Sequence, residues 1–281
     1  MTTRTLFWVK GHGTENDFVL LQDADGQAYP DLDAATVREL CHRRRGVGAD
    51  GVLRAVRTEA IEDGRPYVGV AEWFMDFRNA DGSTGEMCGN GVRVFARHLL
   101  ELGLVDAGRE LPVATRAGVK VVRFEAGGLI TVDMGTVDFP TADGLVVTAG
   151  GRNWPATSVD MGNPHAVAFV DDLAAPGALL DPPTWTPDEA FPKGVNVEFA
   201  LRRGDRHLAM RVHERGVGET RSCGTGACAV AVTAARDDGD AAPATYRVDV
   251  PGGSLTVALR TDGHVELTGP AVLTARGVFD T

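Results

Sequence analysis

The chain has 281 residues, 43% of them hydrophobic and 24% charged, and carries a formal net charge of -11. This composition is ordinary for a globular protein, and the length suits two domains of roughly 130 to 140 residues each. The negative charge repels phosphate backbones and argues against a nucleic-acid partner.

The cysteine spacing argues against a metal site and against a secreted disulfide framework. The four cysteines, Cys41, Cys88, Cys223 and Cys228, form no C-x-x-C pair and no zinc-type spacing with histidine. The first residues lack the apolar core of a signal peptide, and no apolar run is as long as a membrane span. We therefore expect free thiols, a cytoplasmic location and no membrane partner.

The first half of the chain is predicted to contain two helices and several strands. Residues 31–44 have helical apolar spacing, with Asp33 as N-cap and Cys41 as a small buried residue. Residues 65–77, RPYVGVAEWFMDF, predict a strand, and a helix covering residues 91–103 follows the loop MCGNG. Residues 118–135 predict two strands separated by a glycine turn.

The second half is predicted to be strand-rich around one buried helix. Residues 163–170, 195–216 and 245–269 read as strands, with hairpin signals RRGDR, PGG and TDGH. Residues 226–239 form a helix that is apolar and small-sided on nearly every face, so it should be buried. This pattern indicates an α+β fold in which a sheet curls around a central helix.

An internal repeat relates the two halves. The loops MCGNG and SCGTG place Cys88 and Cys223 135 positions apart, and the same offset places Asn79 on Glu214. An asparagine-bearing loop also precedes a strand in each half, in GHGTENDFVLL and DMGNPHAVAFV. The chain should therefore consist of two similar domains, with the boundary near residues 125–128.

Two cysteines at two helix starts suggest stereoinversion at carbon. A helix N-terminus attracts anions and lowers the pKa of a cysteine toward neutrality. One sulfur can remove a proton from carbon while the other returns a proton from the opposite face. A pyridoxal route is disfavoured because none of Lys10, Lys120 and Lys193 lies in a motif.

Other interpretations of these loops are weaker. A lone cysteine near a helix start is usually structural, but two at matched positions are harder to explain in that way. A redox dithiol favours C-x-x-C, and here Cys228 would point into the core. The G-x-G-x-x-G pattern at residues 46–51 follows a helix rather than a strand, which argues against a dinucleotide site.

Seven motifs in series, ENDF, NADGS, MCGNG, MGNPH, GVNVEF, ERGVGET and SCGTGAC, resemble the diaminopimelate epimerase family between residues 11 and 230. The resemblance implies epimerisation of LL- to meso-2,6-diaminopimelate in lysine and peptidoglycan-precursor synthesis, without a cofactor. It implies two domains, residues 1–127 joined by a C-terminal strand at 270–281, and residues 128–269. Each would be a curled, barrel-like, mostly antiparallel sheet around a central helix, with the active site in the cleft between them. A homodimer is also implied.

The same resemblance implies roles for individual residues. Cys88 and Cys223 match the acid/base pair, in which the first is usually labelled the proton donor and the second the acceptor, and the two exchange roles in the reverse reaction. Glu214 and His165 match groups that tune the cysteine pKa. The substrate-binding set is Asn16, Asn79, Gly89, Asn90, Asn163, Asn196, Glu214, Arg215, Gly224 and Thr225.

The sequence differs from the family's usual motifs at two places, and several alternative functions remain open. GTENDF replaces the more usual GAGNDF, and Gly51 stands where some members carry a substrate-binding glutamine. A proline or hydroxyproline racemase shares the two-cysteine logic, but its first loop typically reads Cys-Gly-His. A racemase for another amino acid and a non-catalytic binding protein are the remaining alternatives. A phenazine-type isomerase is disfavoured because it lacks the cysteine pair.

Overall fold

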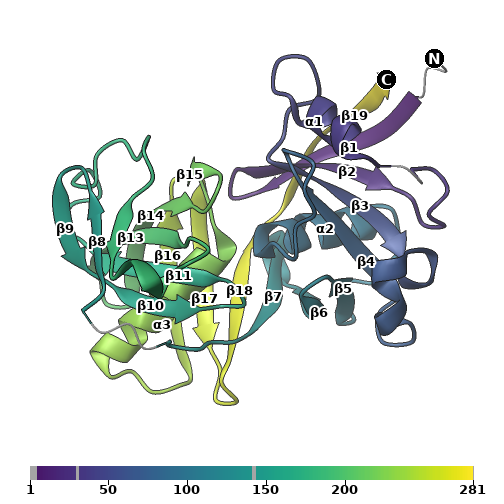
Figure 1. Cartoon of the computed structure of the whole chain (residues 1–281). Helices are drawn as coiled ribbons and strands as arrows, with labels where there is room; N and C mark the ends of the chain where they lie inside the picture. The colour runs from purple at the N-terminus through teal and green to yellow at the C-terminus, as the bar shows by residue number, and fades with distance from the viewer. Residues whose placement is uncertain (1–4, 30–31, 141–143, 281) are drawn as a thin grey trace. The chain divides into compact units, whose positions relative to one another are not determined.

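The computed structural model describes residues 5–29, 32–140 and 144–280 (Figure 1). The chain divides into two compact units. Unit 1 comprises residues 1–132 and 270–281, and unit 2 comprises residues 133–269. Within the described ranges, no helix is both long and apolar enough to cross a membrane.

Unit 1 is one long sheet with one central helix. In the sheet, the strand order is β7-β6-β5-β4-β3-β2-β1-β19. Strand pairs β2–β3 and β4–β5 are parallel and the others are antiparallel. The elements are β1 (Thr5–Gly13), β2 (Asn16–Gln22), α1 (Ala34–Cys41), β3 (Gly51–Arg57), β4 (Trp73–Asn79), α2 (Gly89–Glu101), β5 (Leu111–Thr115), β6 (Gly118–Phe124), β7 (Leu129–Thr136) and β19 (Val272–Asp280).

Helix α2 fills the inside of this sheet. It contacts β1 and β19 near one end of the strand order and β6 near the other, so the sheet curls around it. Ten of its residues are buried, including Val92, Phe95 and Leu99. Helix α1 lies on the opposite face of the sheet, where Val37 and Leu40 pack against side chains of β1, β2 and β3. The sheet curls without closing into a barrel.

Unit 2 repeats the arrangement around α3. In its main sheet, the strand order is β10-β11-β13-β14-β16-β17-β18, with β15 beside β14, and a small sheet has the order β12-β8-β9. Pairs β11–β13 and β14–β16 are parallel. The elements are β8 (Val146–Ala149), β9 (Arg152–Pro155), β10 (Thr157–Asp160), β11 (Pro164–Phe169), β12 (Thr184–Thr186), β13 (Asn196–Gly204), β14 (His207–Glu214), β15 (Gly218–Thr220), α3 (Gly224–Asp238), β16 (Ala244–Val250), β17 (Gly253–Leu259) and β18 (His264–Pro270).

The two units share one topology. Strands β1 to β4, α2 and β5 to β7 follow the same order and directions as β10, β11, β13, β14, α3 and β16 to β18. Asn79 and Glu214, superimposed by the sequence repeat, are the last residues of the matched strands β4 and β14. The predicted α+β fold of two similar, curled halves is confirmed.

The predicted buried helix is also confirmed. Every residue of α3 from Gly224 to Ala235 is buried, and α3 contacts β10, β11, β13, β14, β16 and β17. Small side chains allow this close approach on all sides. Gly239, in the left-handed conformation with φ of 70°, ends the helix as the C-cap.

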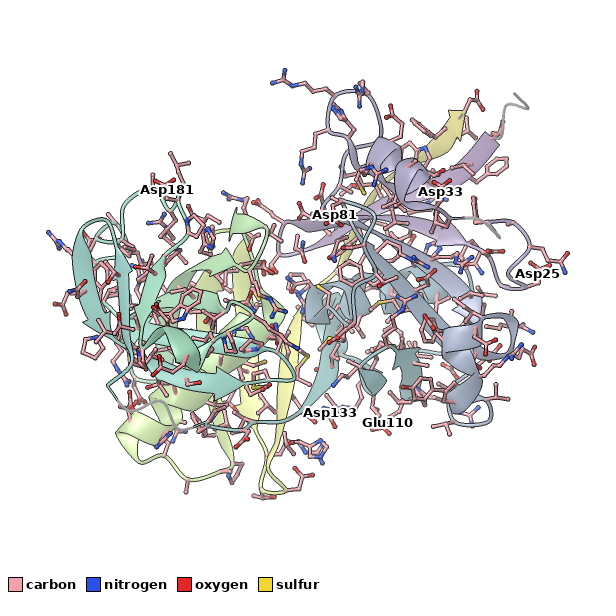
Figure 2. All side chains as sticks on the ribbon, in the orientation of Figure 1. Asp25, Asp33, Asp81, Glu110, Asp133 and Asp181 are labelled. Atoms are coloured by element: carbon pink, nitrogen blue, oxygen red, sulfur yellow. The ribbon has the colours of Figure 1, made fainter. Side chains whose placement is uncertain are left out.

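One strand prediction is partly wrong. In the stretch 65–77, residues through Tyr67 belong to a 3₁₀ helix (Glu62–Tyr67), and β4 begins only at Trp73. Pro66 lacks an N–H for a ladder and fits a helical turn instead. Asp33, labelled in Figure 2 at the start of α1, caps Thr36 N–H at 2.7 Å as predicted. Residue 31, at which the predicted helix 31–44 begins, lies outside the described residues.

Candidate active site

Each central helix begins at a cysteine. Cys88 and Cys223 are the N-cap residues of α2 and α3, with extended backbone angles of (-144°, 119°) and (-122°, 118°). Each sulfur accepts the backbone N–H three residues on, from Gly91 and Gly226, at 3.4 Å. Oxygen-bearing side chains usually occupy this position. Here the cap is a sulfur held against the positive end of a helix.

The next two residues of each helix are those expected to bind a carboxylate. Gly89 and Asn90 open α2, and Gly224 and Thr225 open α3. N–H groups in a first helical turn lack a partner four residues earlier and point toward anions. The two loops therefore combine a sulfur and an anion-binding helix start in the same way.

In unit 1, Asn16 links Cys88 to Asn90. The Cys88 sulfur lies 3.5 Å from Asn16 Oδ1, and Asn90 Nδ2 donates to the same oxygen at 3.2 Å. Asn90 Oδ1 in turn accepts from the buried Arg93 guanidinium at 2.8 Å. The structure thus brings three predicted residues together and adds Arg93, which sequence reasoning missed.

Asp50 fixes the orientation of the Asn16 amide. Its Oδ2 accepts from Asn16 Nδ2 at 2.8 Å, and its Oδ1 accepts from Arg43 at 2.6 Å. Burial raises the pKa of Asp50. Asp17 completes the cluster through ion pairs with Arg43 and Lys10, both 2.9 Å long. This charged cluster was not predicted, although Asp50 lies inside the glycine pattern at residues 46–51 and directly before Gly51.

Asn79 forms hydrogen bonds within the turn that follows β4. Its Nδ2 donates to Ser83 Oγ at 3.0 Å, and its backbone N–H donates to Ser83 O at 2.9 Å. Asp81, labelled in Figure 2 in the turn after β4, accepts from the Ser83 N–H at 2.8 Å. The side chain of Asn79 is thus tied to the turn after β4 rather than to the Cys88 network.

In unit 2, Cys223 is buried and its pKa is raised. Its side chain lies 3.4 Å from Thr225 Oγ1. Burial is the main cause of the raised pKa, and the negative charge of Glu214 adds to it. The sequence-based expectation of a pKa lowered by the helix start is therefore wrong for Cys223 in this conformation. Desolvation of the thiolate outweighs the two hydrogen bonds, from Thr225 and from the Gly226 N–H, that lower the pKa.

His165 lies in a buried polar chain. Its Nδ1 is 2.6 Å from Glu198 Oε1, and its Nε2 is 3.0 Å from Asn163 Oδ1. The side chains of His165 and Glu198 are both fully buried. Burial raises the pKa of Glu198. Sequence reasoning missed Glu198, although a lone acidic residue in the apolar run VNVEFA was a signal for it.

Asn196, Glu214 and Arg215 meet at the ends of β13 and β14. Asn196 Oδ1 accepts from the Arg215 backbone N–H at 2.9 Å, and the Thr220 hydroxyl donates to Glu214 Oε1. The Arg215 side chain is exposed and contacts Lys193 O at 3.4 Å. Among the described residues, the hydrogen-bond partner of this guanidinium is thus a backbone carbonyl rather than a carboxylate.

Nothing in the described part of the chain gathers three or more metal-ligating side chains. All four cysteines are free thiols. Cys41 and Cys228 are buried away from the helix starts, in α1 and in the middle of α3.

Comparison with known proteins assigns the sequence to a family. Residues 8–140 and 157–274 match the family model described as Diaminopimelate epimerase. The chain is 57% identical over 286 residues to the Diaminopimelate epimerase of Streptomyces coelicolor, covering 100% of this chain and 97% of that protein.

Solved structures show the fold. A phenazine biosynthesis protein of the PhzF family from Bacillus anthracis is similar with a TM-score of 0.73 and 17% identity, covering 100% of this chain and 99% of that chain. A hydroxyproline epimerase from Agrobacterium vitis is similar with a TM-score of 0.67 and 16% identity, covering 99% and 93%. At such low identities, these two likenesses concern the fold alone.

Proposed function

The chain belongs to the diaminopimelate epimerase family, and from this premise we propose that it interconverts LL- and meso-2,6-diaminopimelate with Cys88 and Cys223 as its acid/base pair. It is an isomerase. The observation that carries the two-cysteine proposal is the repeated N-cap: the same residue type, backbone angles and sulfur contact occur at the start of both central helices.

The proposed reaction moves one proton off the α-carbon and another onto it. A thiolate removes the α-hydrogen as a proton and becomes a thiol, and the electron pair stays on the carbon. The thiol on the opposite face gives its proton to that carbon and becomes the thiolate. The configuration is inverted, and the two cysteines have exchanged protonation states. The proposal requires both sulfurs to reach one α-carbon from opposite sides.

The resting states of the two sulfurs differ in this scheme. The resemblance labels Cys88 the donor, but because burial raises the pKa of Cys223, we assign the resting thiol and the first proton donation to Cys223. Cys88 then acts as the base for the first turnover. In the reverse direction the roles exchange.

Binding of the substrate carboxylate at the two helix N-termini would stabilise the carbanion that forms at the α-carbon. Gly89 and Asn90 of α2 and Gly224 and Thr225 of α3 would hold the carboxylate of the reacting end. Negative charge spreads from the α-carbon into that carboxylate in the transition state, and preorganised N–H donors stabilise it there. No cofactor is needed for this step.

The distal end of the substrate needs its own recognition. We assign its carboxylate to the exposed guanidinium of Arg215, which can bind it with two parallel hydrogen bonds. Glu214 suits an ammonium group. The remaining polar groups would be bound by Asn16, Asn79, Asn163 and Asn196. Of these, Asn163 contacts His165 and Asn196 contacts the Arg215 backbone.

The test is proton exchange in deuterated water. Reduced protein with LL-diaminopimelate should give the meso isomer carrying deuterium at the inverted α-carbon and none at the distal one, followed by NMR. Cys88→Ala and Cys223→Ala should each abolish inversion, while the matched control Cys41→Ala should keep it. A fully active Cys88→Ala or Cys223→Ala would overturn the two-base scheme.

The alternatives give different results in the same assay. Exchange with proline or hydroxyproline but not with diaminopimelate would keep the thiol chemistry and change the substrate. Binding of diaminopimelate without exchange would favour a non-catalytic protein. Oxidation that forms a Cys88–Cys223 disulfide with loss of activity would directly support the required proximity of the two sulfurs.

We further propose a cytoplasmic homodimer of two-domain subunits, each domain supplying one cysteine. A reducing compartment keeps both thiols free, as the acid/base roles require. Exposed apolar side chains on β1 and β19, Phe7 at 69% and Val278 at 55% exposed, support a protein contact on that face of unit 1. Light scattering coupled to gel filtration would give the mass, and Phe7→Ser should shift it toward a monomer.

A further inference from the structure

The pair His165–Glu198 is the most buried acid–base pair in unit 2. Both side chains have no exposed surface, and the contact between Nδ1 and Oε1 is 2.6 Å long. The second carboxyl oxygen, Oε2, makes no hydrogen bond to any other described residue. A buried carboxyl with one orphaned oxygen is costly, particularly in its charged form.

The same pair packs directly under the Cys223 loop. A methyl group added at Gly226 would lie 2.7 Å from Glu198 Oε1 and 3.3 Å from the Cys223 sulfur. Both atoms therefore border the first turn of α3. Glu198 is placed where it can affect the cysteine and the asparagine loop together.

Unit 1 provides an internal comparison for these positions. In β2 and β3 the register pairs Phe18 with Gly51, and in β11 and β13 it pairs His165 with Asn196. The matched residues are thus Phe18 for His165 and, two positions further along the next strand, Leu53 for Glu198.

The glycines of the two helix starts confirm this correspondence. A methyl group at Gly91 would meet Leu53 Cδ2 at 3.4 Å and Phe18 Cζ at 3.5 Å. At the matched Gly226 the neighbour is Glu198 instead. Since one unit builds this corner from two apolar side chains, the fold itself does not require a histidine and a carboxyl there.

The hydrogen-bond partners determine where the protons lie. Asn163 Oδ1 can only accept, so His165 Nε2 must carry a hydrogen. Either Nδ1 is also protonated and faces a carboxylate, or Glu198 carries the proton and donates it to Nδ1. Complete burial and the orphaned Oε2 favour the second, neutral arrangement. The raised pKa of Glu198 agrees with it.

We propose that Glu198 is a positioning residue that, as a protonated carboxylic acid, donates to His165 Nδ1 and so fixes which end of the Asn163 amide faces the substrate. This inference rests on the proposed function. With Oδ1 held by His165, the Nδ2 hydrogens of Asn163 are left without a described partner and serve as donors to a substrate carboxylate. The hydrogen-bonded chain from Glu198 through His165 to Asn163 therefore determines that Asn163 presents N–H donors, rather than its oxygen, to the substrate. A neutral Glu198 also adds no negative charge near Cys223 to that of Glu214.

Two substitutions of Glu198 test whether its hydrogen-bond donor, rather than an ionisable carboxyl group, is what the site needs. Glu198→Gln keeps a hydrogen-bond donor to Nδ1 without an ionisable proton, and we expect its kcat/KM to stay within about threefold of the original protein. Glu198→Leu copies Leu53, keeps the volume and removes the donor; we expect kcat/KM to fall about tenfold or more, mainly through KM. Equal losses in the two variants would overturn the proposal, and so would a fully active Glu198→Leu.

The ring nitrogens of His165 give a readout that is independent of catalysis. In ¹⁵N-histidine-labelled protein, His165→Phe identifies the His165 signals among the 7 histidines. We expect a protonated Nε2 and an unprotonated Nδ1 at neutral pH, retained in Glu198→Gln and lost in Glu198→Leu. A protonated Nδ1 would overturn the proposal.

The double variant His165→Phe/Glu198→Leu serves as a folding control for Glu198→Leu. It copies the apolar corner of unit 1 and should fold. If the original protein does not epimerise diaminopimelate, the proposed function fails, but the nitrogen shifts still decide whether Glu198 holds His165 as a neutral donor.

Discussion

Adding one methyl group at the matched glycines Gly91 and Gly226 should have opposite effects on stability. Both are the third residue of a helix that begins at a cysteine. In a helix, alanine is more stable than glycine by about 0.5–1 kcal/mol because glycine loses more backbone freedom on folding. That gain is available only where the added methyl group has room.

The room differs between the two units. At Gly91 the nearest atoms to the new Cβ are 3.4 Å or more away, which is ordinary contact. At Gly226 the Cβ would approach Glu198 Oε1 to 2.7 Å, and Glu198 is held by His165 in a fully buried site. Overpacking a tight interior costs typically 1–3 kcal/mol. We expect Gly91→Ala to leave the free energy of unfolding unchanged or raise it slightly, and Gly226→Ala to lower it by about 0.5–2 kcal/mol.

Urea unfolding followed by circular dichroism measures both variants under one condition. Gly91→Ala serves as the matched control, since it tests helix propensity at the same position of the repeat. If Gly226→Ala were as stable as Gly91→Ala, the packing of Glu198 under α3 described above would be wrong. A loss in Gly226→Ala that disappears in the Glu198→Ala background would assign the cost to that carboxyl.

Three other predictions concern charged groups. Asp76 is fully buried and pairs with three arginines. Replacing it by Asn should lower the free energy of unfolding by about 3–5 kcal/mol, measured by urea unfolding, because the buried arginine charges lose their partner. A loss below about 1 kcal/mol would contradict this prediction. Burial opposes ionisation of Asp249, but hydrogen bonds from Ser254 and His207 outweigh it and lower its pKa from 3.8 to about 2. Its contribution to stability is therefore complete above about pH 4 and lost as the pH falls toward 2, so Asp249→Asn should flatten acid unfolding over that range; an unchanged acid profile would refute this. Arg215→Lys should raise KM for diaminopimelate more than it lowers kcat, because lysine cannot make two parallel bonds to a carboxylate; an unchanged KM would remove Arg215 from the distal site.

The long helices and the cysteine loops could be predicted from the sequence because their signals are local. The small apolar side chains of residues 226–239 indicated a buried helix, and the structure buries α3 accordingly. The repeat offset of 135 was visible in the loops and is matched by strand order in both units. Asp33 was identifiable as an N-cap because capping depends on three or four neighbouring residues.

The features that sequence reasoning missed depend on distant partners. Asp50 matters because Asn16 and Arg43 reach it from other parts of the chain. Arg93 bonds to Asn90 one turn earlier in α2, but its Nε also donates to Pro270 O, which lies 177 residues away in the sequence. The pKa of Cys223 could not be deduced from its helix position, since burial, together with the charge of Glu214, reverses the expected direction. The 3₁₀ turn at Glu62–Tyr67 was mistaken for strand because Val and Tyr near it imitate strand composition.

Strand β19 gives the molecule a particular order of assembly during synthesis. It pairs along β1 from Thr5 with Asp280 to His12 with Val272, so unit 1 uses residues made after all of unit 2. On the ribosome, unit 2 can fold as soon as residue 269 has emerged, while β1 waits as an uncovered edge that is prone to pair with other chains. Removing β19 should therefore impair the solubility of newly made protein more than its length suggests. Joining residues 280 and 5 through a short linker and opening the chain between the units should give a permuted protein in which unit 1 forms without waiting.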